Sequence, residues 1–269
     1  MATVSTSGVV SGVGPGNTTI TVTSGTFTKN VALTVLGHPS GSSRVDAPEG
    51  GRPFAVRASI NDVLLVGEQD NSRLGRYNLP STTSAGTIAV GIDPTDVAFS
   101  ADGTKAYVTN QVSGTLGVID VGTNTQTSTV NIGGSPYRVA PSRDGSKIYV
   151  TTGQGNFITV NATTLTAGAP LVLAGPLNGL AVHPTQPVIY VTSTSGTLYE
   201  VSETTGQVLR SVSTGGTSQE VVLSRDGSKL YIAMESGALQ VRSTADLAIV
   251  DTIAASCPGS VKGCLNRSR

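Results

Sequence analysis

The stretch SADGTKAYVTN at residues 100–110 decides the fold, because both of its halves return along the chain. The first half, Ser-x-Asp-Gly-x-Lys, recurs at residues 142–147 and 224–229. The second half, Tyr-Val-Thr, recurs at 149–151 and 190–192, with a related Tyr-Ile-Ala at 231–233. A similar apolar pair, Leu65-Val66, stands where the same spacing places the preceding copy. The chain therefore holds five copies of a repeat of about 41 residues.

Each copy carries the signals of four short strands. Asp-Gly between two apolar runs predicts a hairpin turn, because glycine adopts positive φ without steric cost and aspartate tolerates it. In the second copy the apolar runs lie at 97–100, 106–109, 116–120 and 129–132. The fourth copy replaces the Asp-Gly turn with HPTQP at 183–187, and the first with SIND at 59–62. Four strands in about 41 residues predict one antiparallel blade of a β-propeller.

The predicted fold class is all-β, with five four-stranded antiparallel blades over residues 52–256. Runs such as Val-Ile-Tyr-Val at 188–191 are nearly continuous in apolar character, as expected for a strand buried on both faces. We therefore expect each repeat tyrosine to be buried between neighbouring blades. A helical repeat is excluded, since no helix-length stretch is free of glycine and β-branched residues.

Tyr-Val-Thr-Asn after a Ser-x-Asp-Gly-x-Lys turn resembles the repeat of the YVTN-type β-propellers, found mainly in bacterial and archaeal surface and secreted proteins. The resemblance covers about residues 52–255, while the absence of tryptophan removes the WD40 signature. Copy one lacks the tyrosine and the Asp-Gly, and copy five ends its motif in Ala-Met. Many members of the family close with seven blades. Five copies here imply either a five-bladed ring or an open or truncated array.

The first 37 residues differ from the repeats and resemble the second half of a bacterial Ig-like domain of the group 2 type. The resemblance rests on short alternating runs such as NTTITV at 17–22 and VALTV at 31–35. The opening strands of such a domain are absent, so one apolar face needs a cover. The chain is then a fragment, a partner chain supplies the missing strands, or these strands pack on the propeller. Residues 38–51 are the expected linker, and 257–269 a tail.

Composition limits the classes of partner. Lys plus Arg equals Asp plus Glu at 17 each, and charged residues make up only 13% of the chain. No net field attracts a phosphate backbone or an anionic membrane, so nucleic acid is not an expected partner. No apolar run reaches the roughly 20 residues of a membrane span, and the first ten residues lack a signal-peptide layout. A soluble protein is expected.

Motifs for common catalytic sites are missing from the sequence. It contains no Gly-x-Ser-x-Gly, no phosphate-binding loop and no His-Glu-x-x-His. His38 falls in the linker, and His183 stands where sibling repeats have the turn serine, so a structural role is expected for it. The sequence predicts no metal and no cofactor. Cys257 and Cys264, six residues apart in the tail, predict a small disulfide loop in an oxidising compartment, with free thiols as the alternative.

One carboxylate pair keeps an enzymatic alternative open. The aligned positions that open the innermost strands hold Phe54, Asp96, Arg138, Gly179 and Glu220. Asp96 and Glu220 could act as acid and base across a channel mouth, because some five-bladed propellers are glycosidases. The few aromatic residues argue against sugar subsites, so ordinary loop charges are the favoured interpretation.

The leading hypothesis is a non-enzymatic, extracellular or surface-associated propeller that serves as a binding or structural module of the adhesion or surface-layer type. Its partner would be a protein or glycan on a cell or virion surface; a virion coat or decoration protein and a propeller glycosidase are the alternatives. The expected binding surface is the blade end where the blade-linking loops meet the loops between second and third strands. Its candidate residues are Asp96, Arg138, Glu220, Asn110, Gln111, Asn178, Glu68 and Asp70.

Overall fold

The structure is a computed structural model that describes residues 52–79, 81 and 83–254 with their side chains, and strand backbone at 2–4, 10–12, 16–24 and 27–35. The chain divides into two compact units, Met1–Asp46 and Ala47–Arg269, and the boundary falls within the expected linker. Each unit is described by itself. Among the described residues no helix is long and apolar enough to cross a membrane.

The first unit contains two antiparallel pairs of strands, which agrees with the β-structure predicted for this segment. Strand β1 (Ala2–Val4) pairs with β2 (Val10–Gly12), and β3 (Gly16–Ser24) pairs with β4 (Phe27–Val35). In the longer hairpin Ile20 lies opposite Val31, and Thr18 opposite Leu33. Because alternate strand positions share a face, these apolar positions fall on the same side of the hairpin. That an outside element covers this side remains a prediction.

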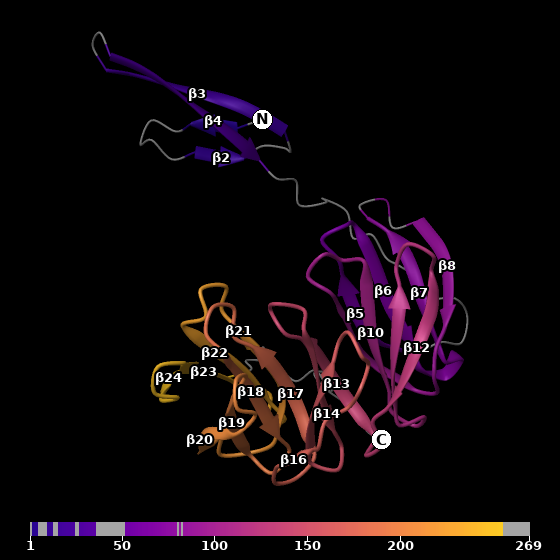
Figure 1. Ribbon diagram of the computed structural model, residues 1–269. Helices are drawn as coiled ribbons and strands as arrows, with labels where there is room; N and C mark the ends of the chain where they lie inside the picture. Colours follow the sequence, from indigo (N-terminus) through magenta and orange to yellow (C-terminus); the bar gives the residue numbers. More distant parts are fainter. Residues whose placement is uncertain are drawn as a thin grey trace, which may run out of the picture. The chain divides into compact units, whose positions relative to one another are not determined.

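The second unit consists of five four-stranded antiparallel sheets, which we call blades 1 to 5 (Figure 1). This confirms the predicted all-β class with propeller-like blades. Each blade takes its strands in chain order from the inside outward. Blade 1 comprises β5 (Pro53–Ala58), β6 (Val63–Glu68), β7 (Arg73–Asn78) and β8 (Thr83–Ala89), with a 3-10 turn at Gln69–Asn71. Blade 2 comprises β9 (Pro94–Phe99), β10 (Lys105–Asn110), β11 (Thr115–Asp120) and β12 (Thr125–Asn131).

The remaining blades repeat this order. Blade 3 comprises β13 (Pro136–Pro141), β14 (Lys147–Thr152), β15 (Asn156–Asn161) and a short β16 (Leu171–Val172). Blade 4 comprises β17 (Leu177–Val182), β18 (Val188–Ser193), β19 (Thr197–Ser202) and β20 (Val208–Ser213). Blade 5 comprises β21 (Ser218–Leu223), β22 (Lys229–Met234), β23 (Leu239–Ser243) and β24 (Ile249–Ile253). Every repeat tyrosine lies on the second strand of its blade, as the spacing predicted.

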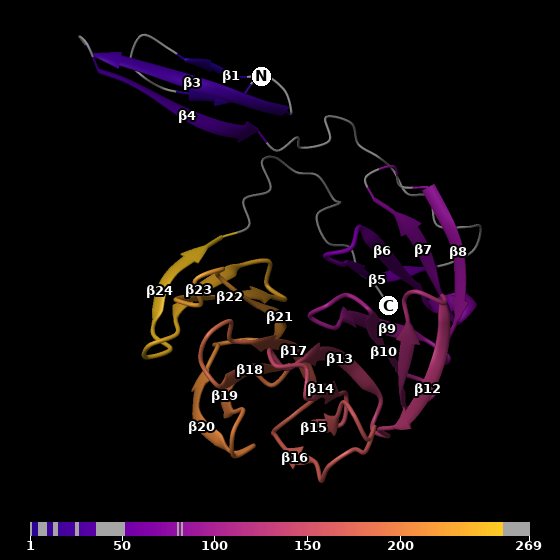
Figure 2. The same ribbon diagram turned by 45° about the horizontal axis from the view of Figure 1, so that its top comes forward.

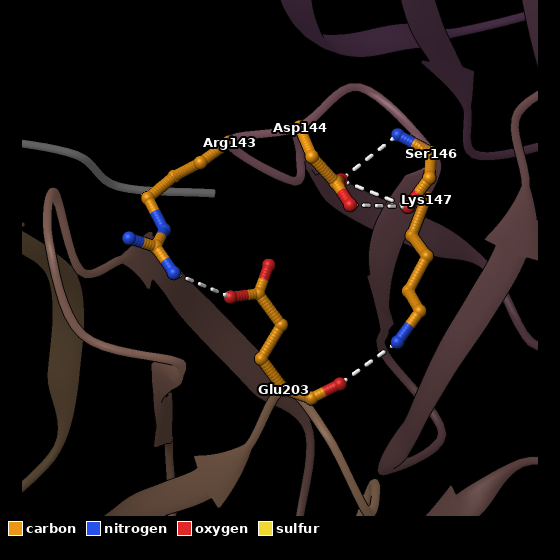
Figure 3. A pocket seen from close by; sticks show the side chains of 5 residues that line it. All are labelled: Arg143, Asp144, Ser146, Lys147 and Glu203. Atoms are coloured by element: carbon orange, nitrogen blue, oxygen red, sulfur yellow. Dashed lines mark hydrogen bonds and ion pairs between the residues drawn. The ribbon is translucent and has the colours of Figure 1, made fainter.

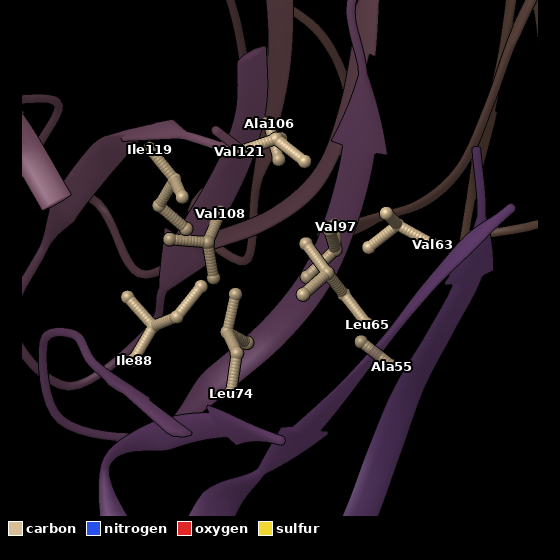
Figure 4. Close-up of a cluster of buried hydrophobic side chains, with 10 residues drawn as sticks. All are labelled: Ala55, Val63, Leu65, Leu74, Ile88, Val97, Ala106, Val108, Ile119 and Val121. Atoms are coloured by element: carbon tan, nitrogen blue, oxygen red, sulfur yellow. The ribbon is translucent and has the colours of Figure 1, made fainter. Parts of the chain in front are cut away.

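A separate apolar cluster fills each of the four interfaces between successive blades. The first joins Leu65, Leu74 and Ile88 of blade 1 to Val97 and Val108 of blade 2 (Figure 4). Tyr107, Tyr149 and Tyr190 belong to the next three clusters and are each at most 4% exposed. These clusters confirm the expected burial between blades for these three tyrosines.

Tyr231 of blade 5 departs from that expectation and is only half-buried. The inner strands approach one another in the order β5, β9, β13, β17 and β21, but within residues 52–254 no comparable contact joins β21 back to β5. The five blades therefore form an open arc (Figure 2). Tyr231 is incompletely covered because none of the blades in residues 52–254 packs against its side of blade 5.

The Asp-Gly turns are closed by side chains. In blade 3, Ser142 Oγ donates to Asp144 Oδ1 at 2.6 Å, and the same oxygen accepts the Ser146 backbone N–H at 3.0 Å. Lys147 N–H then donates to Ser142 Oγ at 2.9 Å. Blades 2 and 5 build the same network around Asp102 and Asp226. Ionised aspartate satisfies these donors best, so the pKa of each of the three carboxyls is lowered to about 2.

These turns predict an acid-sensitive stability. A carboxyl whose folded-state pKa lies below its ordinary value of 3.8 contributes stability above that value and loses it as the pH falls toward 2. We expect the urea midpoint to fall between pH 5 and pH 2, and the triple variant D102N/D144N/D226N to show a shallower fall, since asparagine still accepts the backbone N–H. An unchanged slope in the triple variant would contradict this assignment.

Candidate functional site

The charged residues predicted at the inner rim come together in a groove. Asp96 on β9, Arg138 on β13 and Glu220 on β21 line a cavity of about 800 Å³, with residues 54–57 of β5 and 233–235 of blade 5 on its sides. We call this cavity the rim groove. Short turns precede these inner strands, and residues near the starts of the inner strands of blades 1, 2, 3 and 5 line the same cavity.

Arg138, on the wall of the rim groove, makes three contacts. Its guanidinium pairs with the Glu220 carboxylate at 2.8 Å, Nε donates to the Asn178 carbonyl oxygen at 3.0 Å, and the group lies 4.7 Å from the centre of the Tyr137 ring. Arg138 thus links blade 3 to blades 4 and 5. Its side chain is 15% exposed, so part of the guanidinium remains accessible to a bound partner.

Asp96 is held by backbone groups of two blades. One carboxylate oxygen accepts the Val97 N–H at 2.9 Å, and the other accepts the Val139 N–H of blade 3 at 3.1 Å. Arg57 approaches the first oxygen at 3.5 Å. Burial raises the pKa of Asp96 above its ordinary value, because removal from water outweighs the two arginines and the two amide donors. The carboxyl is 5% exposed and works as a link between blades 2 and 3.

Glu220 is the more accessible of the two carboxylates. A third of its side chain is exposed, and it accepts its neighbour's N–H, from Val221, at 3.2 Å. Burial raises the pKa of Glu220, and Arg138 opposes this shift. Asp96 and Glu220 therefore share one groove and the same direction of pKa shift, but only Glu220 faces solvent appreciably.

An aromatic pair in the rim groove was missed by the sequence reasoning. The rings of Phe54 and Tyr137 meet edge to face with centroids 6.1 Å apart. Phe54 stood in the aligned row of strand-opening residues, and Tyr137 immediately precedes Arg138, so the alignment of copies held the signal. The two residues come from blades 1 and 3, so the contact between their rings depends on the curvature of the arc. The repeat period does not predict that curvature.

The other predicted rim residues do not join this groove. Glu68 and Asn110 are fully buried, so their proposed role at an exposed rim is wrong. Glu68 is drawn inward by Arg73 at 2.7 Å and Asn71 at 3.0 Å, and Asn110 Nδ2 donates to the Thr115 hydroxyl at 3.2 Å. Two further predicted residues are engaged elsewhere: Asp70 pairs with Arg52 at 2.8 Å, and Asn178 spans to the Ser218 carbonyl at 3.4 Å. Gln111 is half-buried in the loop after β10.

A second, smaller pocket lies at the opposite ends of blades 3 and 4. Its volume is about 380 Å³, and its lining residues are Arg143, Asp144, Ser146, Lys147 and Glu203 (Figure 3). Glu203 accepts from Arg143 at 3.3 Å and from the Tyr149 hydroxyl at 3.0 Å, while its carbonyl accepts from Lys147 Nζ at 2.8 Å. Arg143 and Glu203 thus form an ion pair, Lys147 is held by a backbone carbonyl, and the pocket lies between two blades.

His183 has the structural role that the sequence predicted. Nδ1 accepts the N–H groups of Thr185 and Gln186 at 3.1 and 2.9 Å, so the ring replaces the serine and aspartate of the sibling turns. Nε2 then carries the proton and donates to the Gly227 carbonyl at 3.1 Å. In the part of the chain that the structure describes, no cluster of three or more histidine, cysteine or acidic residues could hold a metal ion. Cys257 and Cys264 lie outside the described residues.

No protein-family model matches the chain, and no curated protein matches it in sequence. Among solved structures, a chain titled Kuenenia stuttgartiensis hydrazine synthase is similar in fold, with a TM-score of 0.65 and 17% identity. The match covers 78% of this chain and 61% of that chain, so this chain spans about three fifths of the length of that neighbour. At this identity the likeness supports the propeller-like architecture and says nothing about activity.

Proposed function

We propose that the chain is a non-enzymatic binding and structural module, displayed outside the cell or on a virion surface, that holds a polar protein or glycan partner in the rim groove. The observation that carries this proposal is the grouping of Phe54, Tyr137 and Arg138 around one groove. Aromatic residues and arginine dominate the binding energy of protein interfaces, because they offer large contact area and directed hydrogen bonds.

Two features of the groove favour a polar partner. Arg57 donates to the Val97 carbonyl through Nε at 3.1 Å, yet half of its side chain is exposed. Glu235 on the facing wall is exposed as well. Charges of opposite sign on two walls would fix the orientation of a partner that carries both donors and acceptors.

The finer architecture belongs to the same proposal. We infer that the five blades are YVTN-type repeats and that the N-terminal strands are a partial Ig-like segment completed by another chain or by this protein's own further residues. Proteins of the YVTN type are found mainly on surfaces, which is the basis for the extracellular location. Detection of the protein in purified virus particles, rather than on cells, would favour the coat or decoration alternative.

Charge exchange across the groove tests the binding site. In the double variant R138E/E220R the ion pair can still form, but the bond from Arg138 Nε to the Asn178 carbonyl is lost, so circular dichroism must first show that the variant is folded. The charge pattern offered to a partner is inverted. We expect binding to a glycan array or to intact host cells to weaken at least about tenfold. The matched control is R225E, which alters an exposed arginine at the other end of blade 5. Equal binding by R138E/E220R and R225E would move the interface away from the rim groove.

The glycosidase alternative remains a second candidate, favoured by the raised pKa of both Asp96 and Glu220. A general acid needs such a shift, but Asp96 has both oxygens engaged by backbone N–H groups. We therefore expect no release of reducing sugar from a polysaccharide panel. Hydrolysis by the natural protein that disappears in both D96N and E220Q would overturn the non-enzymatic proposal.

A further inference from the structure

One side of blade 5 exposes apolar side chains at positions that are buried or half-buried in blades 2, 3 and 4. We call the side of a blade that faces the following blade its front, and the opposite side its back. On the front of blade 5, Val222 pairs with Tyr231 as Ala98 pairs with Tyr107 in blade 2. Val222 and Ile253 are each 52% exposed. The fourth-strand positions equivalent to Ile253, Ile88 in blade 1 and Val130 in blade 2, are 2% and 7% exposed.

The back of blade 1 shows the complementary exposure. Val56 pairs with Val66 on β6 and is 53% exposed. The valine at the same register position is Val97 in blade 2, Val139 in blade 3 and Val221 in blade 5, and none of these three exceeds 3% exposure. Blade 4 has Leu180 there, at 9%.

The chain itself shows what covers such surfaces. At each of its four internal interfaces the front of one blade packs on the back of the next. The front of blade 5 and the back of blade 1 are thus the same two kinds of surface that pack together at each internal interface, but here neither is covered by the other. Within one chain the rim groove separates these two surfaces. Closing it would require rotation at four interfaces whose side chains are already close-packed, which costs packing energy.

We propose that the front of blade 5 binds the back of blade 1 of a second copy of this chain, so that copies associate head to tail. This interface is heterologous, because each copy contributes a different surface. It requires no rearrangement of the internal clusters, and it covers the apolar side chains of Val56, Val222 and Ile253 that each copy leaves exposed. The proposal does not depend on the chemistry of a partner in the rim groove, but Val56 also lines that groove, so a second copy and such a partner would compete there.

Complementation between two variants tests this arrangement on the full chain. V222D blocks the front of blade 5 and leaves the back of blade 1 intact, while V56D does the reverse. By light scattering, the natural chain should grow in mass with concentration, and each variant alone should remain monomeric. An equimolar mixture should stop at a heterodimer, since only one intact pair of surfaces remains.

The control is L209D, at a side chain of equal exposure on the outermost strand of blade 4, which should associate like the natural chain. Circular dichroism checks that each variant is folded, and the milder V222S and V56S replace any that is not. A natural chain that stays monomeric up to about 200 µM, a mixture that stays monomeric, or a control that fails to associate would each overturn the proposal. The binding constant of either blocked surface should weaken at least about tenfold.

Discussion

Replacing Tyr149 with alanine is expected to lower the free energy of unfolding by about 3 kcal/mol or more, in the range for large-to-small aromatic changes in a core. The side chain is 1% exposed and stacks on Phe157 with ring centroids 5.6 Å apart. Its hydroxyl also donates to Glu203 of the next blade at 3.0 Å. The variant therefore leaves a cavity between blades 3 and 4 and removes a donor from a largely buried carboxylate. Urea unfolding at neutral pH measures the loss.

Two further variants separate these contributions. Y149F keeps the ring and removes only the hydroxyl, so its expected loss is about 1 kcal/mol. Y231A changes the same repeat position in blade 5, where the ring is only half-buried, and should cost roughly half as much as Y149A. A loss under about 1 kcal/mol for Y149A, or equal losses at both tyrosines, would contradict the assignment of one tyrosine to a closed interface and the other to an open one.

The repeat made most of the blade architecture predictable. A period of about 41 residues fixes which residues share a register position, and burial on both sides of a blade makes the second strands apolar. The Asp-Gly turns were readable because their closure is local, over six residues. His183 was assigned to the same turn from its alignment alone, and its two backbone acceptor contacts confirm that role.

Features set by the arc as a whole could not be read from the repeat. Whether blade 5 meets blade 1 depends on the angle between blades, and side-chain volume at four interfaces sets that angle. The period is identical for an open arc and a closed ring. Glu68 was expected in the loop between the second and third strands, whereas the structure places it at the end of β6 and buries it beside Arg73 and against Gly75. Glu68 is buried because Arg73 pairs with it, and Arg73 is not a residue that recurs in the other copies.

Replacing Asp96 with alanine is the second change with a large expected effect on the free energy of unfolding. Two opposing contributions decide whether the protein is stabilised or destabilised. Its raised pKa means that burial of the charge costs more than its surroundings return, so removing the carboxylate relieves that cost at neutral pH. Removal also leaves the N–H groups of Val97 and Val139 without their acceptor in a buried position. An unsatisfied buried donor costs about 1–3 kcal/mol, so two of them outweigh the relief. We expect D96A to lose about 2 kcal/mol of unfolding free energy.

The pH dependence of that loss tests the direction of the pKa shift of Asp96 and therefore the burial of its carboxyl. A folded-state pKa above the ordinary 3.8 means that Asp96 favours the fold most at low pH, and that this contribution falls as the pH rises through the folded pKa. The difference between the natural chain and D96A should therefore be largest in acid and smaller near neutrality, opposite in direction to the turn aspartates. E220Q is the matched control, since its carboxyl is a third exposed and should cost under about 1 kcal/mol. If D96A proved as stable as the natural chain at every pH, the two backbone contacts would contribute nothing to holding blade 2 against blade 3, and Asp96 would again be free for a role in binding or catalysis.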